Sequence, residues 1–241
     1  MTLLFAGHET TALALTWIWY LLARHPEVAE RLRRDVATVL AGRVPTGADL
    51  PSLPYIRMVV EEAMRLYPPA WMMARAARAD DVIGGYPIPA GTTVFLSPYL
   101  THRHPAVWPE PERFDPERFA SDRVARRPPG AYFPFAAGPR ACLGASLAMR
   151  EAQLMVAQVI QTYDVVLVAG QQVVPQPRLT LRPRHGMPMV CRYTHAGLRR
   201  RGTGTDVTSR VGAPWTHGAT VGVGGPPCHP PHGEAPVQRC P

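Results

Sequence analysis

The 241-residue chain has no lysine and no asparagine, so all 26 of its Lys-or-Arg positions are arginine, as a GC-rich gene would produce. It also has only four cysteines. One follows a glycine turn, one lies in an expected strand, and two lie near the Gly- and Pro-rich end. We therefore expect no disulfide framework, and a reducing cytoplasm suits these thiols.

A signal peptide and a membrane anchor are also lacking. The apolar start, residues 1–22, has no basic segment before it and no convincing cleavage site. It carries His8 and Glu9, where a spanning segment would be charged at a cost. The sequence thus predicts a soluble, cytoplasmic protein with no membrane anchor.

The formal net charge of +8 raises the question of a nucleic-acid partner. Five arginines against Asp206 and Glu234 give the last 47 residues +3, and the other +5 is spread over scattered arginines. No basic helix is interleaved with aromatic residues, so we predict no nucleic-acid partner. Positive charge near Cys142 instead favours a docking surface for an acidic protein, because complementary charge speeds encounter.

Residues 135–144, F-A-A-G-P-R-A-C-L-G, place a cysteine between two glycines and beside an arginine. Gly138 and Gly144 allow backbone conformations closed to residues with a Cβ, so the chain can turn amide N–H groups toward the sulfur. A helix expected from about Ala145 adds its positive end. Both effects favour a Cys142 thiolate, the form that binds a metal. The alternative is an ordinary buried cysteine after a glycine turn.

This segment, read as F-x-x-G-x-R-x-C-x-G, resembles the haem-binding loop of the cytochrome P-450 family. The resemblance implies that the Cys142 thiolate is the axial ligand of a haem b iron. It further implies that Arg140 pairs with a haem propionate and that Phe135 packs near the sulfur and tunes its donor strength. Three other segments resemble motifs of the same family and follow in the family's order.

Residues 6–11, A-G-H-E-T-T, resemble the distal helix motif of the family and lie within an apolar stretch. The resemblance implies that Gly7 leaves space for oxygen over the haem and that Glu9 supplies protons. The Thr10 hydroxyl either bonds to a carbonyl one turn earlier or holds a water at the iron, with a bulge in the helix. For Glu9 and Thr10 the alternative is the solvated face of a surface helix.

Glu62 and Arg65, three residues apart, lie on one face of a helix that the following prolines end. Most such pairs are exposed and contribute little to stability. The resemblance adds an arginine from residues 108–119, W-P-E-P-E-R-F-D-P-E-R-F, which completes a buried structural network. Position assigns Arg118 to this role, with Arg113 as the alternative because P-E-R-F occurs twice.

Short strands are expected between residues 76 and 91, where alternation ends in turns. The resemblance implies that Arg75 binds the second haem propionate, with Arg78 as a weaker candidate. His102 is interpreted as structural rather than as a haem or metal ligand. Three apolar, adaptable residues are expected to face an apolar substrate: Ala70, Trp71 and Met72.

The fold class expected is mainly α with a small β portion (α+β), as the C-terminal, haem-ligating part of the cytochrome P-450 fold in residues 1–194. The N-terminal half is expected to be missing, with Met1 an internal methionine of a longer frame. A long amphipathic helix is expected over 145–164 and a closing β-hairpin over 179–190. Residues 195–241, with nine Gly and seven Pro, are predicted to be disordered. Their Cys228-His229-Pro-Pro-His232 string is too small a set for a zinc knuckle.

The resemblance implies a bacterial-type haem-thiolate monooxygenase that inserts one oxygen atom from O₂ into an apolar organic substrate. Electrons would come from NAD(P)H through a ferredoxin or flavodoxin-type donor with its reductase. One alternative is a vestigial haem-binding fragment without turnover. Another is a cysteine-nucleophile hydrolase, which needs a histidine base beside Cys142 and has no local candidate.

Overall fold

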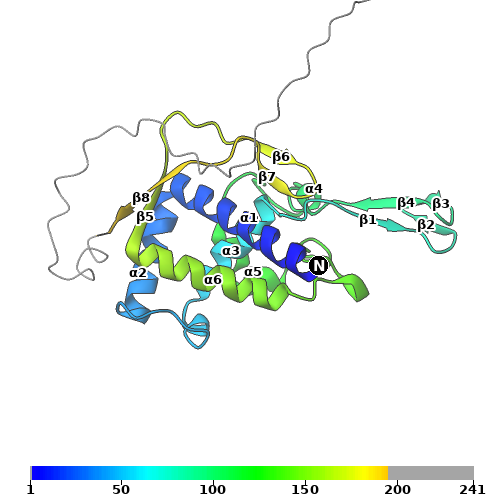
Figure 1. Ribbon diagram of the computed structural model, residues 1–241. Helices are drawn as coiled ribbons and strands as arrows, with labels where there is room; N and C mark the ends of the chain where they lie inside the picture. Colours follow the sequence, from blue (N-terminus) through cyan, green and yellow to red (C-terminus); the bar gives the residue numbers. More distant parts are fainter. Residues whose placement is uncertain (1, 195–241) are drawn as a thin grey trace, which may run out of the picture. The chain divides into compact units, whose positions relative to one another are not determined.

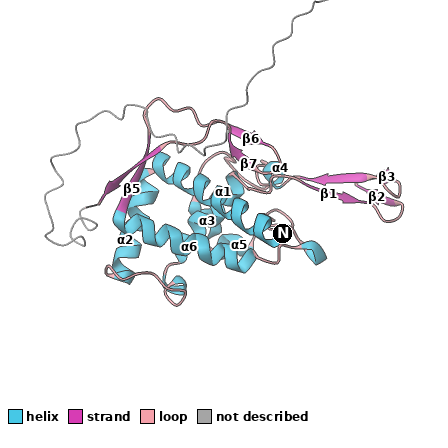
Figure 2. Cartoon of the chain, viewed as in Figure 1, coloured by secondary structure: helices cyan, strands magenta, loops and turns pink. Residues whose placement is uncertain are grey.

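The computed structural model describes residues 2–194, with side chains from residue 6 onward (Figure 1). The tail predicted to be disordered and its Cys228 string lie outside the described residues. Helices dominate and the strands are short (Figure 2), so the predicted mainly α fold with a small β portion is confirmed. None of the helices in the described part is long and apolar enough to cross a membrane.

Three helices pack on one another to form the core: α1 (Thr2–Arg24), α3 (Pro54–Leu66) and α6 (Ala145–Thr162). They lie side by side in Figure 1. α3 starts with a proline at its first position, where no intrahelical N–H bond is lost, and it ends before Pro68. The core combines fully buried side chains from all three helices, among them Trp17, Ile18, Ile56, Val59 and Val156.

The helix α2 (Pro26–Leu40) contacts α1, α3 and α6. Its buried residues recur every fourth position, which places them on one face of the helix: Val28, Leu32, Val36 and Leu40. Ala41 ends the helix in the left-handed conformation, with φ 45°, and donates its N–H to Ala37 O. The spacing of the apolar residues therefore explains how α2 covers the core.

Within the described residues, the strands form four antiparallel pairs. β1 (Met73–Ala76) pairs with β4 (Thr93–Leu96), and β2 (Asp81–Ile83) pairs with β3 (Tyr86–Ile88) across a glycine turn. β5 (Tyr163–Leu167) pairs with β8 (Met189–Tyr193), and β6 (Pro175–Pro177) pairs with β7 (Leu181–Pro183). The short strands expected between residues 76 and 91 are thus present as β2 and β3, whereas β1 reaches this range only at Ala76 and β4 lies outside it.

Two predicted boundaries at the end of the described chain are wrong. The helix expected to reach residue 164 ends at Thr162, because Tyr163 takes an extended conformation and begins β5. The hairpin expected over residues 179–190 does not form, because β7 pairs back with β6 while β8 pairs with β5. The Tyr163 and Tyr193 rings lie 5.0 Å apart across that second pair, a cross-strand contact that favours its register.

Short helical turns connect these elements: η1 (Leu50–Ser52), α4 (Pro98–Thr101), η2 (Pro116–Phe119), α5 (Ser121–Ala125) and η3 (Gly138–Arg140). Two of them begin with side-chain caps. Ser97 Oγ accepts a hydrogen bond from the Leu100 N–H, and Asp115 accepts one from the Glu117 N–H. η2 packs on α3 and α5, which brings Arg118 close to Glu62 on α3.

Candidate functional site

The segment that carries Cys142 is a turn followed by the long helix α6. Ala136 and Gly138 have positive φ values, 61° and 70°, whereas Gly144 has φ −87°. Gly138 therefore adopts a backbone conformation that is closed to most residues with a Cβ, as predicted. The same prediction for Gly144 is wrong. The tight turn uses Ala136 instead, a conformation that costs free energy in a residue with a Cβ. Gly144 serves as the N-cap of α6.

The Cys142 backbone closes the loop, since its N–H donates a 2.8 Å hydrogen bond to the Phe135 carbonyl. The side chain is exposed as a free thiol, and α6 begins three residues later at Ala145. Within the described residues no hydrogen bond reaches the Cys142 sulfur, so the amide donors expected there are not seen. The loop thus presents Cys142 outward at the start of a helix.

The surroundings of Cys142 fit a flat apolar group that carries carboxylates. Leu143 is 91% exposed and Leu147 is 70% exposed. Arg140 is exposed and, among the described residues, forms no ion pair. Arg75 lies in β1, outside this loop, and among the described residues it donates only to Ala74 O at 2.8 Å and to Met73 Sδ at 3.9 Å. Exposed apolar side chains, a free thiol and arginines without a carboxylate suit a haem with two propionates.

The predicted distal residues lie on α1, which runs without a bulge from Thr2 to Arg24. Thr10 Oγ1 donates a 2.6 Å hydrogen bond to Ala6 O, the first of its two predicted states. Glu9 Oε1 accepts a 2.7 Å hydrogen bond from Thr180 Oγ1. A Cβ added at Gly7 would meet no atom within 4 Å, so the helix has open space beside it. Glu9 and Thr10 are half-buried, which does not match a fully solvated face.

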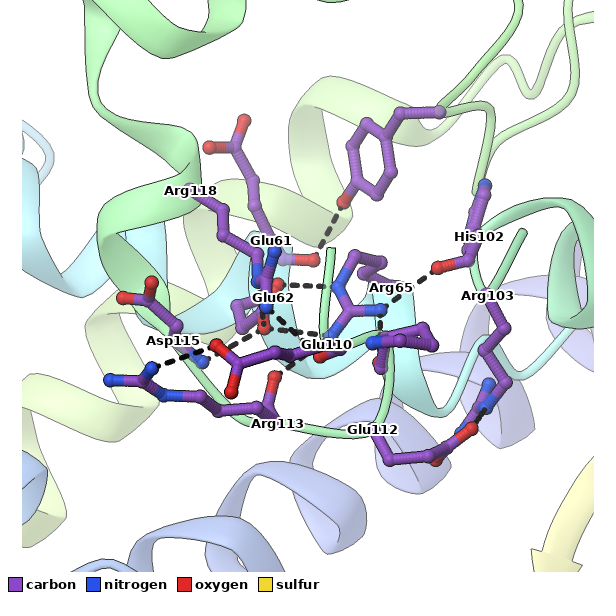
Figure 3. A network of polar contacts seen from close by, with 12 residues as sticks. Glu61, Glu62, Arg65, His102, Arg103, Glu110, Glu112, Arg113, Asp115 and Arg118 are labelled. Carbon is purple, nitrogen blue, oxygen red and sulfur yellow. Dashed lines mark hydrogen bonds and ion pairs between the residues drawn. The ribbon is translucent and has the colours of Figure 1, made fainter. Parts of the chain in front are cut away.

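Glu62 and Arg65 form the centre of a buried network (Figure 3). Both side chains are fully buried, and Arg65 donates to both Glu62 oxygens, at 2.7 and 2.9 Å. Arg118 Nε lies 3.6 Å from Glu62 Oε1, whereas the exposed Arg113 side chain pairs with Glu110. The geometry therefore selects Arg118 over Arg113 as the third charged member.

The remaining bonds of this network join α3 to the loops around it. Arg65 donates to three backbone carbonyls, and Glu62 Oε1 accepts the Asp115 N–H at 2.9 Å. Burial raises the pKa of the Glu62 carboxyl, and its bonds from Arg65 and Asp115 act in the opposite direction. Burial also lowers the pKa of the Arg118 guanidinium. Such a network locks the loop of residues 102–118 onto α3, which is a structural role.

His102 is fully buried and is not placed as a ligand. Its Nε2 accepts a 3.0 Å hydrogen bond from the Phe133 N–H, two residues before Phe135. Burial, with the charges of Arg65, Arg103 and Arg127, lowers the pKa of His102 to about 3. The ring is therefore neutral at neutral pH. In the described part of the chain, no group of three or more His, Cys, Asp or Glu could hold a metal ion.

The three residues predicted to face a substrate lie just before β1. Trp71 is half-buried against the core, and its Nε1 donates a 2.7 Å hydrogen bond to the Arg178 carbonyl. Its own carbonyl accepts the Ser97 hydroxyl at 3.0 Å. Trp71 is thus part of the framework that joins two chain segments. Met72 is 39% exposed, and Ala70 is half-buried.

Two residues at the site were missed by sequence reasoning. Thr180 binds Glu9 from 171 positions away, and Ala136 takes the left-handed conformation that was assigned to Gly144. No local pattern identifies either one, since Thr180 is an ordinary loop threonine and alanine rarely has positive φ. The structure brings Phe135 together with Cys142 and brings Glu62 together with Arg65 and Arg118. It shows no hydrogen bond or ion pair between Arg75 and the Cys142 loop within the described residues.

Comparison with known proteins agrees with this geometry. The family model of cytochrome P450 matches residues 1–188. Cyclooctatin synthase of Streptomyces melanosporofaciens is 42% identical over 181 residues, which cover 75% of this chain and 39% of that protein. Cyclooctat-9-en-7-ol 5-monooxygenase of the same organism is 44% identical over 170 residues, 70% of this chain and 37% of that protein. The crystal structure of the cytochrome P450DA heme domain superposes with a TM-score of 0.77 at 35% identity, covering 81% and 44% of the two chains.

The chain belongs to the cytochrome P450 family of haem-thiolate proteins. The resemblance noted in the sequence and the expected fold are thereby confirmed. The chain spans about two fifths of the length of the curated relatives it matches. The matched crystal structure is of a heme domain, and one of the two relatives is named as a monooxygenase.

Proposed function

We propose that this chain is the haem-ligating portion of a monooxygenase in which Cys142 is the axial ligand of haem b. The observation that carries the proposal is the presentation of an exposed Cys142 thiol by a loop closed through Phe135, directly before α6. When bound, haem supplies the activation of O₂ and the insertion of one oxygen atom into an apolar organic substrate.

The residues around Cys142 would hold the cofactor. Arg140 and Arg75 would each pair with a propionate, since neither has a carboxylate partner among the described residues and arginine binds carboxylates in a bidentate way. Leu143 and Leu147 would cover apolar edges that would otherwise be exposed. Phe135 would keep water from the sulfur and, through its carbonyl, fix the Cys142 backbone.

Glu9 and Thr10 would handle protons on the distal side. The Glu9 carboxylate is held by Thr180, which fixes where it can give or take a proton. The Thr10 hydroxyl now donates to Ala6 O, and a rotation about χ1 would let it hold a water instead. Residues 8–11, H-E-T-T, are four consecutive polar residues on a largely apolar helix, which supports this role.

The substrate and the electron source are inferred from the family. One relative is named as a monooxygenase of cyclooctat-9-en-7-ol, which supports oxygen insertion as the reaction class. We propose an apolar organic substrate near Ala70 and Met72. Electrons would come from NAD(P)H through a ferredoxin or flavodoxin-type donor, and a reducing cytoplasm would suit the free thiols of Cys142 and Cys191.

A second candidate is a haem-binding fragment without turnover. The share of the relatives' length that this chain covers, about two fifths, supports it, because catalysis needs a haem that is shielded from water. Both candidates require Cys142 to bind haem, and they differ only in product formation.

The test is the absorption spectrum of the purified chain with added haem, reduced under carbon monoxide. We expect the red-shifted Soret band of thiolate ligation. Cys142→Ser should abolish it, and Cys191→Ser, which changes another exposed cysteine on β8, should keep it. A Cys142→Ser protein that retained the band would refute the ligand assignment.

A further inference from the structure

The fully buried imidazole of His102 lies between the ion-pair network and the segment that leads into the Cys142 loop. His102 Nε2 accepts the Phe133 N–H at 3.0 Å. Two residues later, the Phe135 carbonyl accepts the Cys142 N–H at 2.8 Å. The imidazole therefore anchors the loop just before the residue that closes it.

The backbone of His102 is itself held by the ion-pair network. Arg65 Nη1 donates to the His102 carbonyl at 2.8 Å, and Arg65 is held by Glu62 (Figure 3). The imidazole is enclosed by aromatic rings, with centroids 5.0 Å away in Tyr132 and 5.3 Å away in Phe133. An imidazole fixed at its backbone and packed on its faces can define the position of the N–H that it binds.

The hydrogen bond also determines the tautomer of the ring. Because Nε2 accepts, it carries no proton, and the neutral ring must carry its proton on Nδ1. Among the described residues, His102 Nδ1 has no hydrogen-bond partner although it is buried. An unpaired buried donor costs free energy that an apolar side chain of similar size would avoid. Of the two ring nitrogens of His102, only Nε2 therefore forms a stabilising hydrogen bond within the described residues.

We propose that His102 is a positioning residue for the haem-binding loop, which holds the Phe133 N–H through Nε2 and thereby sets where the Cys142 thiol is presented. The inference rests on the proposed role of Cys142 in haem binding. The position of the loop can nevertheless be measured without haem, so the two proposals can fail separately.

Three variants of the full chain test the acceptor. His102→Leu removes it at similar volume, and His102→Gln keeps an acceptor near the position of Nε2. His104→Leu is the control, because His104 Nδ1 also accepts a backbone N–H, from Ala106 at 3.3 Å, but at an exposed site away from the loop. We expect amide hydrogen exchange at Phe133 to be about tenfold faster in His102→Leu, and within about twofold of wild type in the other two.

The second readout is the thiol itself, in a background where Cys191, Cys228 and Cys240 are replaced by serine. The alkylation rate of Cys142 by iodoacetamide, measured without haem, should change in His102→Leu and return toward the wild-type value in His102→Gln. With haem added, the fraction that shows the thiolate Soret band after reduction under carbon monoxide should follow the same order. A role in fold stability alone would not produce this rescue pattern in folded protein.

Each outcome decides the proposal. Unchanged Phe133 exchange and Cys142 alkylation in a folded His102→Leu protein would overturn it. If His102→Leu does not fold and His102→Gln does, the acceptor is supported; if neither folds, ring shape rather than the acceptor matters and the proposal fails. A third outcome separates the two proposals: exchange and alkylation change in His102→Leu, but no protein, wild type included, shows the thiolate band. That result would support the positioning of the loop by His102 and would count against haem ligation by Cys142.

Discussion

Thr180 Oγ1 donates a 2.7 Å hydrogen bond to Glu9 Oε1, which joins the loop between β6 and β7 to the helix α1. Thr180 is buried and Glu9 is half-buried, so the bond is partly shielded from solvent. The carboxylate that is proposed to handle protons is thus positioned by a residue from the opposite end of the described chain. Hydrogen bonds to a charged group are stronger than those between neutral groups.

The Glu9–Thr180 bond should be measurable as a coupling in folding stability. We expect Thr180→Val to lower the free energy of unfolding by about 1.5–3 kcal/mol, because a charged acceptor loses its donor. Thr180→Ser, which keeps the hydroxyl, should cost less. The measurement is urea unfolding of Glu9→Leu, which removes the acceptor, of Thr180→Val and of the double variant. Strictly additive effects would show that the bond contributes nothing to stability.

The charged network predicts that replacing its arginines lowers folding stability by different amounts. Arg65→Met leaves Glu62 buried without its main partner and three carbonyls without a donor, so unfolding should become easier by about 3–5 kcal/mol. Arg113→Ala should change stability by no more than about 0.5 kcal/mol, since the side chain is exposed. Arg118→Ala should fall between them. Equal losses for Arg113 and Arg118 in thermal and urea unfolding would contradict the assignment of Arg118.

The neutral His102 predicts a pH dependence of stability. Its pKa is about 3 in the folded protein and 6.5 ordinarily, so the unfolded chain binds a proton that the folded chain does not. Stability is therefore complete above about pH 6.5 and falls by about 1.4 kcal/mol per pH unit below it.

Urea unfolding at about pH 7.5 and about pH 5.5 measures this loss, and His102→Gln is the control. Burial raises the pKa of Glu62, which acts in the opposite direction, but this effect is common to the wild type and His102→Gln and cancels in their difference. If the wild type and His102→Gln lose the same stability between the two pH values, His102 is not the group responsible.

Replacing Thr10 should change the coupling of NAD(P)H consumption to product formation and leave substrate binding unchanged. In a longer active polypeptide that carries residues 6–11, Thr10→Ala should keep substrate binding and divert consumed NAD(P)H into hydrogen peroxide. Proton-transfer steps contribute about 10² to 10⁴ in rate. The ratio of product to NAD(P)H consumed measures this effect, and Thr10→Ser, which keeps the hydroxyl, should restore it. An unchanged ratio in Thr10→Ala would remove Thr10 from the mechanism.

The 241-residue chain tested alone should not turn over substrate repeatedly. The 241 residues align with about two fifths of the length of the curated relatives, so residues that shield the haem from water in those proteins would be absent when this stretch is tested alone. The measurement is product formation by the chain with haem, a surrogate ferredoxin and its reductase, offered fatty acids, terpenes and steroids. Multiple turnovers would refute this prediction and, with it, the candidate of an inactive fragment.

Much of the site could be predicted from local sequence because its chemistry is carried by short strings. The spacing of Gly138, Arg140 and Cys142 identifies the loop, since turn, charge and thiolate must lie within a few residues of one another. The three-residue spacing of Glu62 and Arg65 places both on one helix face for a purely geometric reason. Helix starts at Pro54 and Ala145 follow from the local signals of proline and glycine.

Other features were decided only by tertiary structure. The P-E-R-F string occurs twice, and only the packing of η2 on α3 shows that Arg118 reaches Glu62 while Arg113 stays exposed. The pairing of β8 with β5 depends on strands that are distant in sequence, which alternation cannot determine. The bonds of Thr180 to Glu9 and of His102 to Phe133 join residues with no sequence relation. Sequence by itself thus determined which groups are proposed to carry the chemistry, and long-range packing decided which partners hold them, because contact energies depend on distance in space rather than along the chain.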